Sequence, residues 1–220
     1  MTFSATPSHV SRLTSHPAAR FLALGDSYTI GEGVGADGRW PNQLVAALRR
    51  DAVAIDEPRI VAQTGWTTDE LAAAIDASAL QPPYDLVTLL IGVNNQYRGR
   101  EVENYRDEFR ALLARAIALA GHRPQRVVVV SIPDWGVTRF GRESGRDPAQ
   151  IARELDEYNA ANARIAAELG VRYADVAPAA RAGGADPDQL AADGLHPSAA
   201  MYRRWLDAVL PAARMALASP

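Results

Sequence analysis

Residues 21–29 read Phe-Leu-Ala-Leu-Gly-Asp-Ser-Tyr-Thr, a short apolar run followed directly by turn-forming polar residues. The apolar run predicts a buried strand, and Gly25 marks the point where the strand ends. Ser27 therefore lies where the chain leaves the predicted strand and turns. That is a position from which a hydroxyl could act as a nucleophile.

Strand-like and helix-like segments alternate along the rest of the chain. Strands are expected at residues 21–24, 59–62, 85–91, 126–132 and 171–175. Helices are expected at residues 41–50, from a Thr67–Glu70 capping box through Ile75, at 104–120, at 149–169, and in a last segment that contains Tyr202 and Val209. This alternation indicates a parallel sheet covered by helices on both faces. Residues 133–148 are expected to form a long polar loop of the kind that is often functional.

Composition and charge favour a globular enzyme. The 220 residues are 48% hydrophobic and 22% charged, which argues against disorder, and a net charge of −3 argues against a nucleic-acid partner. The absence of cysteine excludes disulfides, thiol catalysis and cysteine metal sites. We expect a flexible tail at 1–19 and a single domain at 20–217. No signal peptide or membrane span is visible, so a cytoplasmic location without integral membrane association is the default expectation.

Five residues are predicted to meet at one edge of the sheet. Ser27 follows the first strand, Gly65 the second and Asn94 the third, while Asp193 and His196 lie between the fifth strand and the last helix. Ligands of open parallel sheets bind at the carboxyl ends of the strands. The five residues can therefore converge there, although more than 160 positions separate the first from the last.

These residue types suit acyl transfer through a serine. A serine hydroxyl needs a neutral imidazole to accept its proton, and His196 is the best placed of the four histidines. Asp193, three residues earlier, can orient the imidazole from the same turn. The Asn94 amide and the backbone N–H groups of Gly65 and Ser27 are candidate donors to the tetrahedral oxyanion. No metal or other cofactor is expected.

Around these residues the chain resembles the SGNH hydrolases, also called the GDSL esterase/lipase superfamily. The resemblance covers residues 21–200 and involves four blocks, namely Gly25-Asp26-Ser27-Tyr28, Gly65, Gly92-Val93-Asn94-Asn95 and Asp193-Gly194-Leu195-His196-Pro197. It implies a flavodoxin-like three-layer α/β/α sandwich with a parallel sheet of about five strands. Tyr28 replaces the family's Leu. Asn95 stands where the family often has Asp, which leaves Asn94 intact and raises a question about the local hydrogen-bond scaffold.

The resemblance implies a serine esterase that hydrolyses carboxylic esters of small molecules through an acyl-enzyme, with short acyl chains favoured. Lysophospholipase, thioesterase and carbohydrate deacetylase activities are alternatives within the same family. A nucleotide- or ligand-binding protein without catalysis is a rival from another class. The glycines of residues 31–35 have the spacing G-x-G-x-G with no helix opening at once, so they fail the dinucleotide fingerprint. The scarcity of histidine weakens a metallohydrolase interpretation.

Several other residues remain open from the sequence. Trp135 and Phe140 either line an acyl pocket or pack onto the domain. Tyr202 and Trp205 are expected in the core of the last helix. For Arg98 and Arg100 we favour a solvated charged loop over substrate contact.

Overall fold

The computed structural model describes residues 17–219, and its centre is a five-stranded parallel sheet in the order β2-β1-β3-β4-β5. The strands are β1 (Phe21–Gly25), β2 (Arg59–Ala62), β3 (Leu86–Leu90), β4 (Val127–Val130) and β5 (Arg172–Ala174). This is the flavodoxin-like order of doubly wound sheets. The predicted fold class is therefore confirmed.

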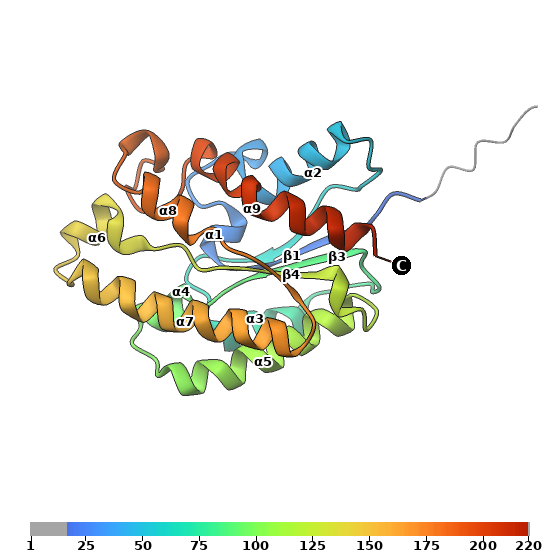
Figure 1. Ribbon diagram of the computed structural model, residues 1–220, viewed down its shortest axis with the longest axis horizontal. Helices are drawn as coiled ribbons and strands as arrows, with labels where there is room; N and C mark the ends of the chain where they lie inside the picture. Colours follow the sequence, from blue (N-terminus) through green and yellow to red (C-terminus); the bar gives the residue numbers. More distant parts are fainter. Residues whose placement is uncertain (1–16, 220) are drawn as a thin grey trace, which may run out of the picture.

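Helices cover both faces of the sheet. They are α1 (Ser27–Ile30), α2 (Trp40–Arg50), α3 (Thr68–Ala77), α4 (Val93–Tyr97), α5 (Val102–Leu119), α6 (Arg139–Glu143), α7 (Pro148–Glu168), α8 (Ala177–Gly183) and α9 (Ala199–Leu217). Short 3₁₀ helices occupy Ala36–Gly38, Pro124–Arg126, Trp135–Val137 and Pro187–Gln189. In Figure 1, α2 and α9 pack together above the sheet, and α3, α5 and α7 form the layer below it.

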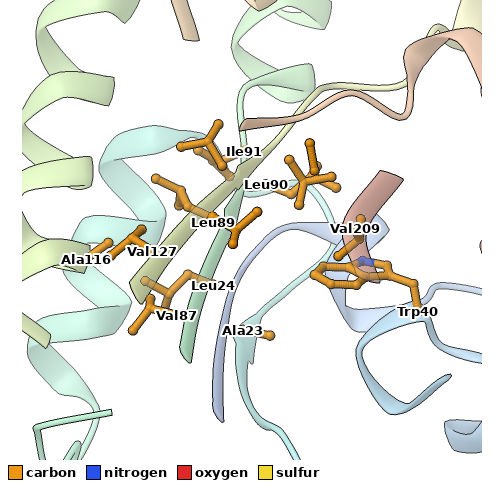
Figure 2. Close-up of a cluster of buried hydrophobic side chains, with 14 of the residues drawn as sticks. Ala23, Leu24, Trp40, Val87, Leu89, Leu90, Ile91, Ala116, Val127 and Val209 are labelled. Atoms are coloured by element: carbon orange, nitrogen blue, oxygen red, sulfur yellow. The ribbon is translucent and has the colours of Figure 1, made fainter. Parts of the chain in front are cut away.

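The three central strands β1, β3 and β4 are buried on both faces, as the lack of apolar–polar alternation in residues 85–91 indicates for β3. Figure 2 shows Ala23 on the side of Trp40 and Val209, whereas Leu24 points to the opposite side, toward Ala116. Burial of one large apolar side chain stabilises the fold by roughly 1.5–3 kcal/mol. Because each central strand has two such faces, the sheet is a rigid platform for the residues at its edge.

The helix that follows β2 begins as the sequence predicts. Thr67 is the N-cap of α3, and its side chain accepts a hydrogen bond from the backbone N–H of Glu70. In return, the Glu70 carboxylate accepts the Thr67 N–H at 2.8 Å. This capping box satisfies two of the N–H groups that a helix start leaves unpaired. It also determines where the preceding Gly65 turn ends.

Two connections contain helices although the sequence predicts loops for them, namely residues 133–148 and the segment from the strand at 171–175 to His196. Residues 133–148 include a 3₁₀ turn and α6, and the connection between β5 and His196 includes α8 and a further 3₁₀ turn. The expectation failed because these helices are too short to show an apolar period. Side-chain caps hold the first of these connections: Asp134 accepts the Gly136 N–H at 2.9 Å, and Thr138 Oγ1 accepts the Gly141 N–H at 3.0 Å.

Most of the predicted tail, residues 1–16, lies outside the described part of the chain. Near its end, Ala19 pairs with Ile55, and its N–H donates to the Ala54 carbonyl at 2.8 Å. Among residues 17–219, no helix combines the length and apolar character needed to cross a membrane.

Candidate active site

Ser27 is the first residue of α1 and follows β1 after a tight turn. Asp26 is the N-cap of α1, and its Oδ1 accepts the Tyr28 N–H at 3.0 Å. A Cβ on Gly25 would lie 2.2 Å from Thr29 Oγ1 and 2.5 Å from the Leu90 carbonyl oxygen, so only glycine fits at the strand end. Ser27 is 4% exposed, and it lines a mostly apolar cavity at this edge of the sheet.

His196 and Asp193 form a bonded pair in the turn that precedes α9. His196 Nδ1 lies 2.6 Å from Asp193 Oδ2. A carboxylate can only accept, so Nδ1 carries the proton and Nε2 is left with a free lone pair. His196 is 7% exposed and lines the same cavity as Ser27, while Asp193 lies behind the imidazole.

The backbone of the same turn holds the Asp193 carboxylate. Its Oδ1 accepts the N–H of Leu195 at 2.8 Å and the N–H of His196 at 3.0 Å. Burial by itself would raise the pKa of Asp193, but the bonds from the His196 ring and from these two N–H groups outweigh it and lower the pKa. Asp193 is therefore a carboxylate at neutral pH, ready to stabilise a charged imidazole.

Three hydrogen-bond donors converge near Ser27. Asn94, on α4, donates from Nδ2 to the Trp66 carbonyl at 2.9 Å, which fixes the amide plane and leaves its second N–H proton free. Gly65 has a φ of 88°, a conformation that favours glycine. Within residues 17–219, the backbone N–H groups of Ser27 and Gly65 donate to no protein acceptor.

The cavity that these residues share has a volume of about 230 Å³. Ser27, Gly65, Asn94 and His196 provide its polar side. Aromatic and aliphatic side chains form the remainder, and these are Tyr28, Val93, Tyr97, Trp135, Phe140 and Leu195. The structure thus brings together the five predicted site residues, four on the cavity wall and Asp193 behind His196.

Trp135 and Phe140 do both of the things that the sequence left open: they line the cavity and pack with the hydrophobic core, with ring centroids 6.0 Å apart. Tyr97 was missed by the sequence analysis. Its ring stands edge-on to Trp135 at 5.4 Å, and the i, i+3 spacing from Asn94 on α4 is the signal that places both on one helix face.

The two arginines of this region do not line the cavity. Arg98 donates to the Gly65 carbonyl at 2.6 Å, and Arg100 is paired with Asp69 at 2.7 Å. Arg98 therefore supports the Gly65 turn from outside. Tyr202 and Trp205 are fully buried core residues of α9, as expected. Across residues 17–219, no three His, Asp or Glu side chains are grouped so as to hold a metal ion.

One family model matches most of the chain. Residues 23–204 match the GDSL-like Lipase/Acylhydrolase family. A search of curated proteins finds no match.

Solved structures share the fold at low sequence identity. TesA is 20% identical with a TM-score of 0.71, covering 90% of this chain and 99% of its own. The psychrotrophic esterase EstA from Pseudoalteromonas sp. is 17% identical with a TM-score of 0.69, covering 91% of this chain and 99% of its own. A variant of Axe2, an acetyl xylan esterase from Geobacillus stearothermophilus, is 22% identical with a TM-score of 0.66, covering 90% of this chain and 95% of its own.

Proposed function

The chain belongs to the GDSL-like lipase/acylhydrolase family of SGNH ester hydrolases, and from this premise we propose that it is a serine esterase for short-chain carboxylic esters. The observation that carries the proposal is the shared cavity of Ser27 and His196, with the Asp193 carboxylate 2.6 Å from the imidazole. The partner is a small-molecule ester.

The proposed reaction has two steps. Ser27 Oγ attacks the ester carbonyl while His196 Nε2 takes its proton, and the tetrahedral oxyanion accepts hydrogen bonds from Asn94 Nδ2 and the N–H groups of Gly65 and Ser27. The carbon–oxygen bond to the alcohol breaks, and His196 returns the proton to the leaving oxygen. Water then attacks the acyl-enzyme with His196 as base, which releases the acid and restores the serine.

The cavity size supports a short acyl group. Pockets for drug-sized ligands have volumes of roughly 300–1,000 Å³, and the volume here is about 230 Å³. The aromatic and aliphatic wall suits a hydrocarbon chain better than a charged one, because no Asp, Glu, Lys or Arg among residues 17–219 lines it. Lysophospholipids and carbohydrate acetates would need their bulky alcohol portion to remain outside the cavity.

Replacement of Ser27 by alanine tests the nucleophile. We expect Ser27→Ala to abolish hydrolysis of p-nitrophenyl acetate and butyrate, while circular dichroism and the melting temperature show an intact fold. A fluorophosphonate should label one site in the native protein and none in the variant. Ser78→Ala, at the end of α3 and away from the cavity, is the matched control and should retain activity and labelling. Turnover of these esters by Ser27→Ala at the native rate would refute the proposal.

A substrate panel tests the acyl preference separately. We expect p-nitrophenyl esters of two to four acyl carbons to have a higher kcat/KM than those of twelve or more, and an acetylated xylan, an acyl thioester and a lysophospholipid belong in the same panel. A higher kcat/KM for the long chains would overturn the short-chain proposal and leave the serine mechanism standing.

A further inference from the structure

Asn95 is fully buried, and the hydrogen bonds of its side chain go to two other helices. It follows Asn94 on α4. Its amide contacts Thr68 at the start of α3 and Glu108 on α5. The sequence left open what an asparagine at this position does to the local hydrogen bonds, and these contacts answer it.

The side-chain hydrogen bonds of this cluster are all donated toward the carboxylate of Glu108. Asn95 Oδ1 accepts the Thr68 N–H at 3.1 Å, and Asn95 Nδ2 donates to Thr68 Oγ1 at 2.7 Å and toward Glu108 Oε2 at 3.4 Å. The Thr68 hydroxyl in turn donates to Glu108 Oε2. An amide is thus both acceptor and donor here, and the carboxylate of Glu108 accepts the last proton of the chain.

The cluster lies directly behind the candidate oxyanion donors. Asn94 bonds the Trp66 carbonyl at 2.9 Å, and its neighbour Asn95 bonds both the N–H and the hydroxyl of Thr68. Two adjacent asparagines thereby tie α4 to residues 66–68, the segment that follows Gly65.

We propose that Asn95 is a positioning residue that sets the spacing of the two oxyanion donors Gly65 and Asn94. We also propose that position 95 needs an amide because the carboxylate of Glu108 lies beside it. This inference rests on the proposed esterase function. An aspartate at position 95 would place a second carboxylate beside Glu108 and compete for the single Thr68 proton. With glutamine at position 108, the chain of donors reverses: the glutamine amide donates to Thr68 Oγ1, and the hydroxyl donates to the aspartate.

The experiment compares Asn95→Asp, Glu108→Gln and the double variant on p-nitrophenyl butyrate. Loss of one oxyanion donor lowers the rate roughly 10²- to 10³-fold, so misplacement of one should lower kcat by about tenfold to a hundredfold. We expect this decrease for Asn95→Asp with KM changed less than about twofold, because the hydrogen bonds are needed in the transition state. The double variant should have the same kcat as Glu108→Gln alone.

Asn104→Asp is the matched control, because Asn104 Nδ2 donates to Glu108 Oε1 at 2.8 Å on the exposed side of the same carboxylate. It introduces the same charge beside the same partner, away from the oxyanion donors, and should leave kcat unchanged. Circular dichroism and melting temperatures accompany every variant.

Two results would overturn the inference. One is native kcat in folded Asn95→Asp, and the other is a double variant that folds but stays below Glu108→Gln alone. If Asn95→Asp does not fold, the comparison of kcat between the double variant and Glu108→Gln decides by itself. Ser27→Ala measured in parallel separates this outcome from failure of the proposed function, since an inactive serine variant leaves the esterase proposal intact whichever way Asn95 behaves.

Discussion

The two carboxylate oxygens of Asp193 have different partners. Oδ1 accepts two backbone N–H groups of its own turn, and Oδ2 lies 2.6 Å from His196 Nδ1. The first set holds the carboxylate in place, so the second bond has a defined direction. The side chain is 41% exposed, and solvent therefore weakens the charge interaction between Asp193 and a protonated imidazole.

Replacement of Asp193 by asparagine tests how much that charge contributes. We expect Asp193→Asn to lower kcat, because an amide stabilises a protonated imidazole less than a carboxylate does. The loss should be smaller than that of His196→Ala, which removes the base itself. Both variants are to be compared with the native protein in kcat and KM on p-nitrophenyl butyrate. Native kcat in Asp193→Asn would show that Asp193 does not orient the base.

At the scale of one element, α4 organises the cavity although it spans only Val93–Tyr97. Asn94 and Tyr97 face the cavity, whereas Asn95 and Gln96 are buried behind it. Gln96 Oε1 accepts the Trp135 Nε1–H at 2.9 Å, so this short helix also orients the indole that lines the cavity. One helical turn after β3 thus connects the polar side of the cavity to its apolar side.

Tyr97 lines the cavity, and its side chain is half exposed. We expect Tyr97→Ala to raise kcat/KM for octanoyl relative to butyryl p-nitrophenyl esters severalfold, since removal of the ring leaves room for the longer chain. Tyr97→Phe keeps the ring and should retain the native ratio. An unchanged ratio in Tyr97→Ala would mean that the acyl chain does not pass this residue.

Over the whole molecule, parallel strands place their carboxyl ends at one edge, and each strand connection there carries a part of the site. Ser27 follows β1, Gly65 follows β2 and Asn94 follows β3, while the connection after β4 supplies Trp135. The same packing leaves Asp26 fully buried, with Oδ2 unpaired among the described residues. Burial raises the pKa of Asp26 to about 7, although hydrogen bonds from the Tyr28 and Asp26 backbone oppose the shift.

The raised pKa of Asp26 makes the stability of the fold depend on pH. Between the ordinary carboxyl pKa of about 4 and the folded-state pKa of about 7, the folded protein keeps a proton that the unfolded chain has lost, so stability falls as pH rises. The slope for one proton is about 1.4 kcal/mol per pH unit.

Asp26→Asn keeps a side-chain oxygen that can accept the Tyr28 N–H at the start of α1, and it removes the carboxyl group that titrates. We expect the free energy of unfolding of the native protein, measured in urea and compared with that of Asp26→Asn, to decline from pH 4 to 7 and to level off above pH 7. Parallel stability curves for the two proteins over this range would contradict the assignment.

Much of the fold was readable from local patterns. Apolar runs of strand length, helical spacing and the Thr67–Glu70 capping box are local signals, and the strands at 59–62 and 127–130 were predicted within about two residues. The helices α6 and α8 were not, because elements of one or two turns show no apolar period and depend on caps and tertiary contacts.

For the candidate site, the sequence by itself determined which residue types stand after which strand, namely Ser27, Gly65, Asn94, Asp193 and His196. That order follows from chain connectivity. Because parallel strands end at the same edge of the sheet, residues that follow different strands lie close together there. Only the tertiary structure decided that Trp135, Phe140 and Tyr97 line the cavity and that Asn95 is bonded to Thr68 and Glu108. Those contacts join segments far apart in the chain, and their geometry depends on how whole helices pack against the sheet.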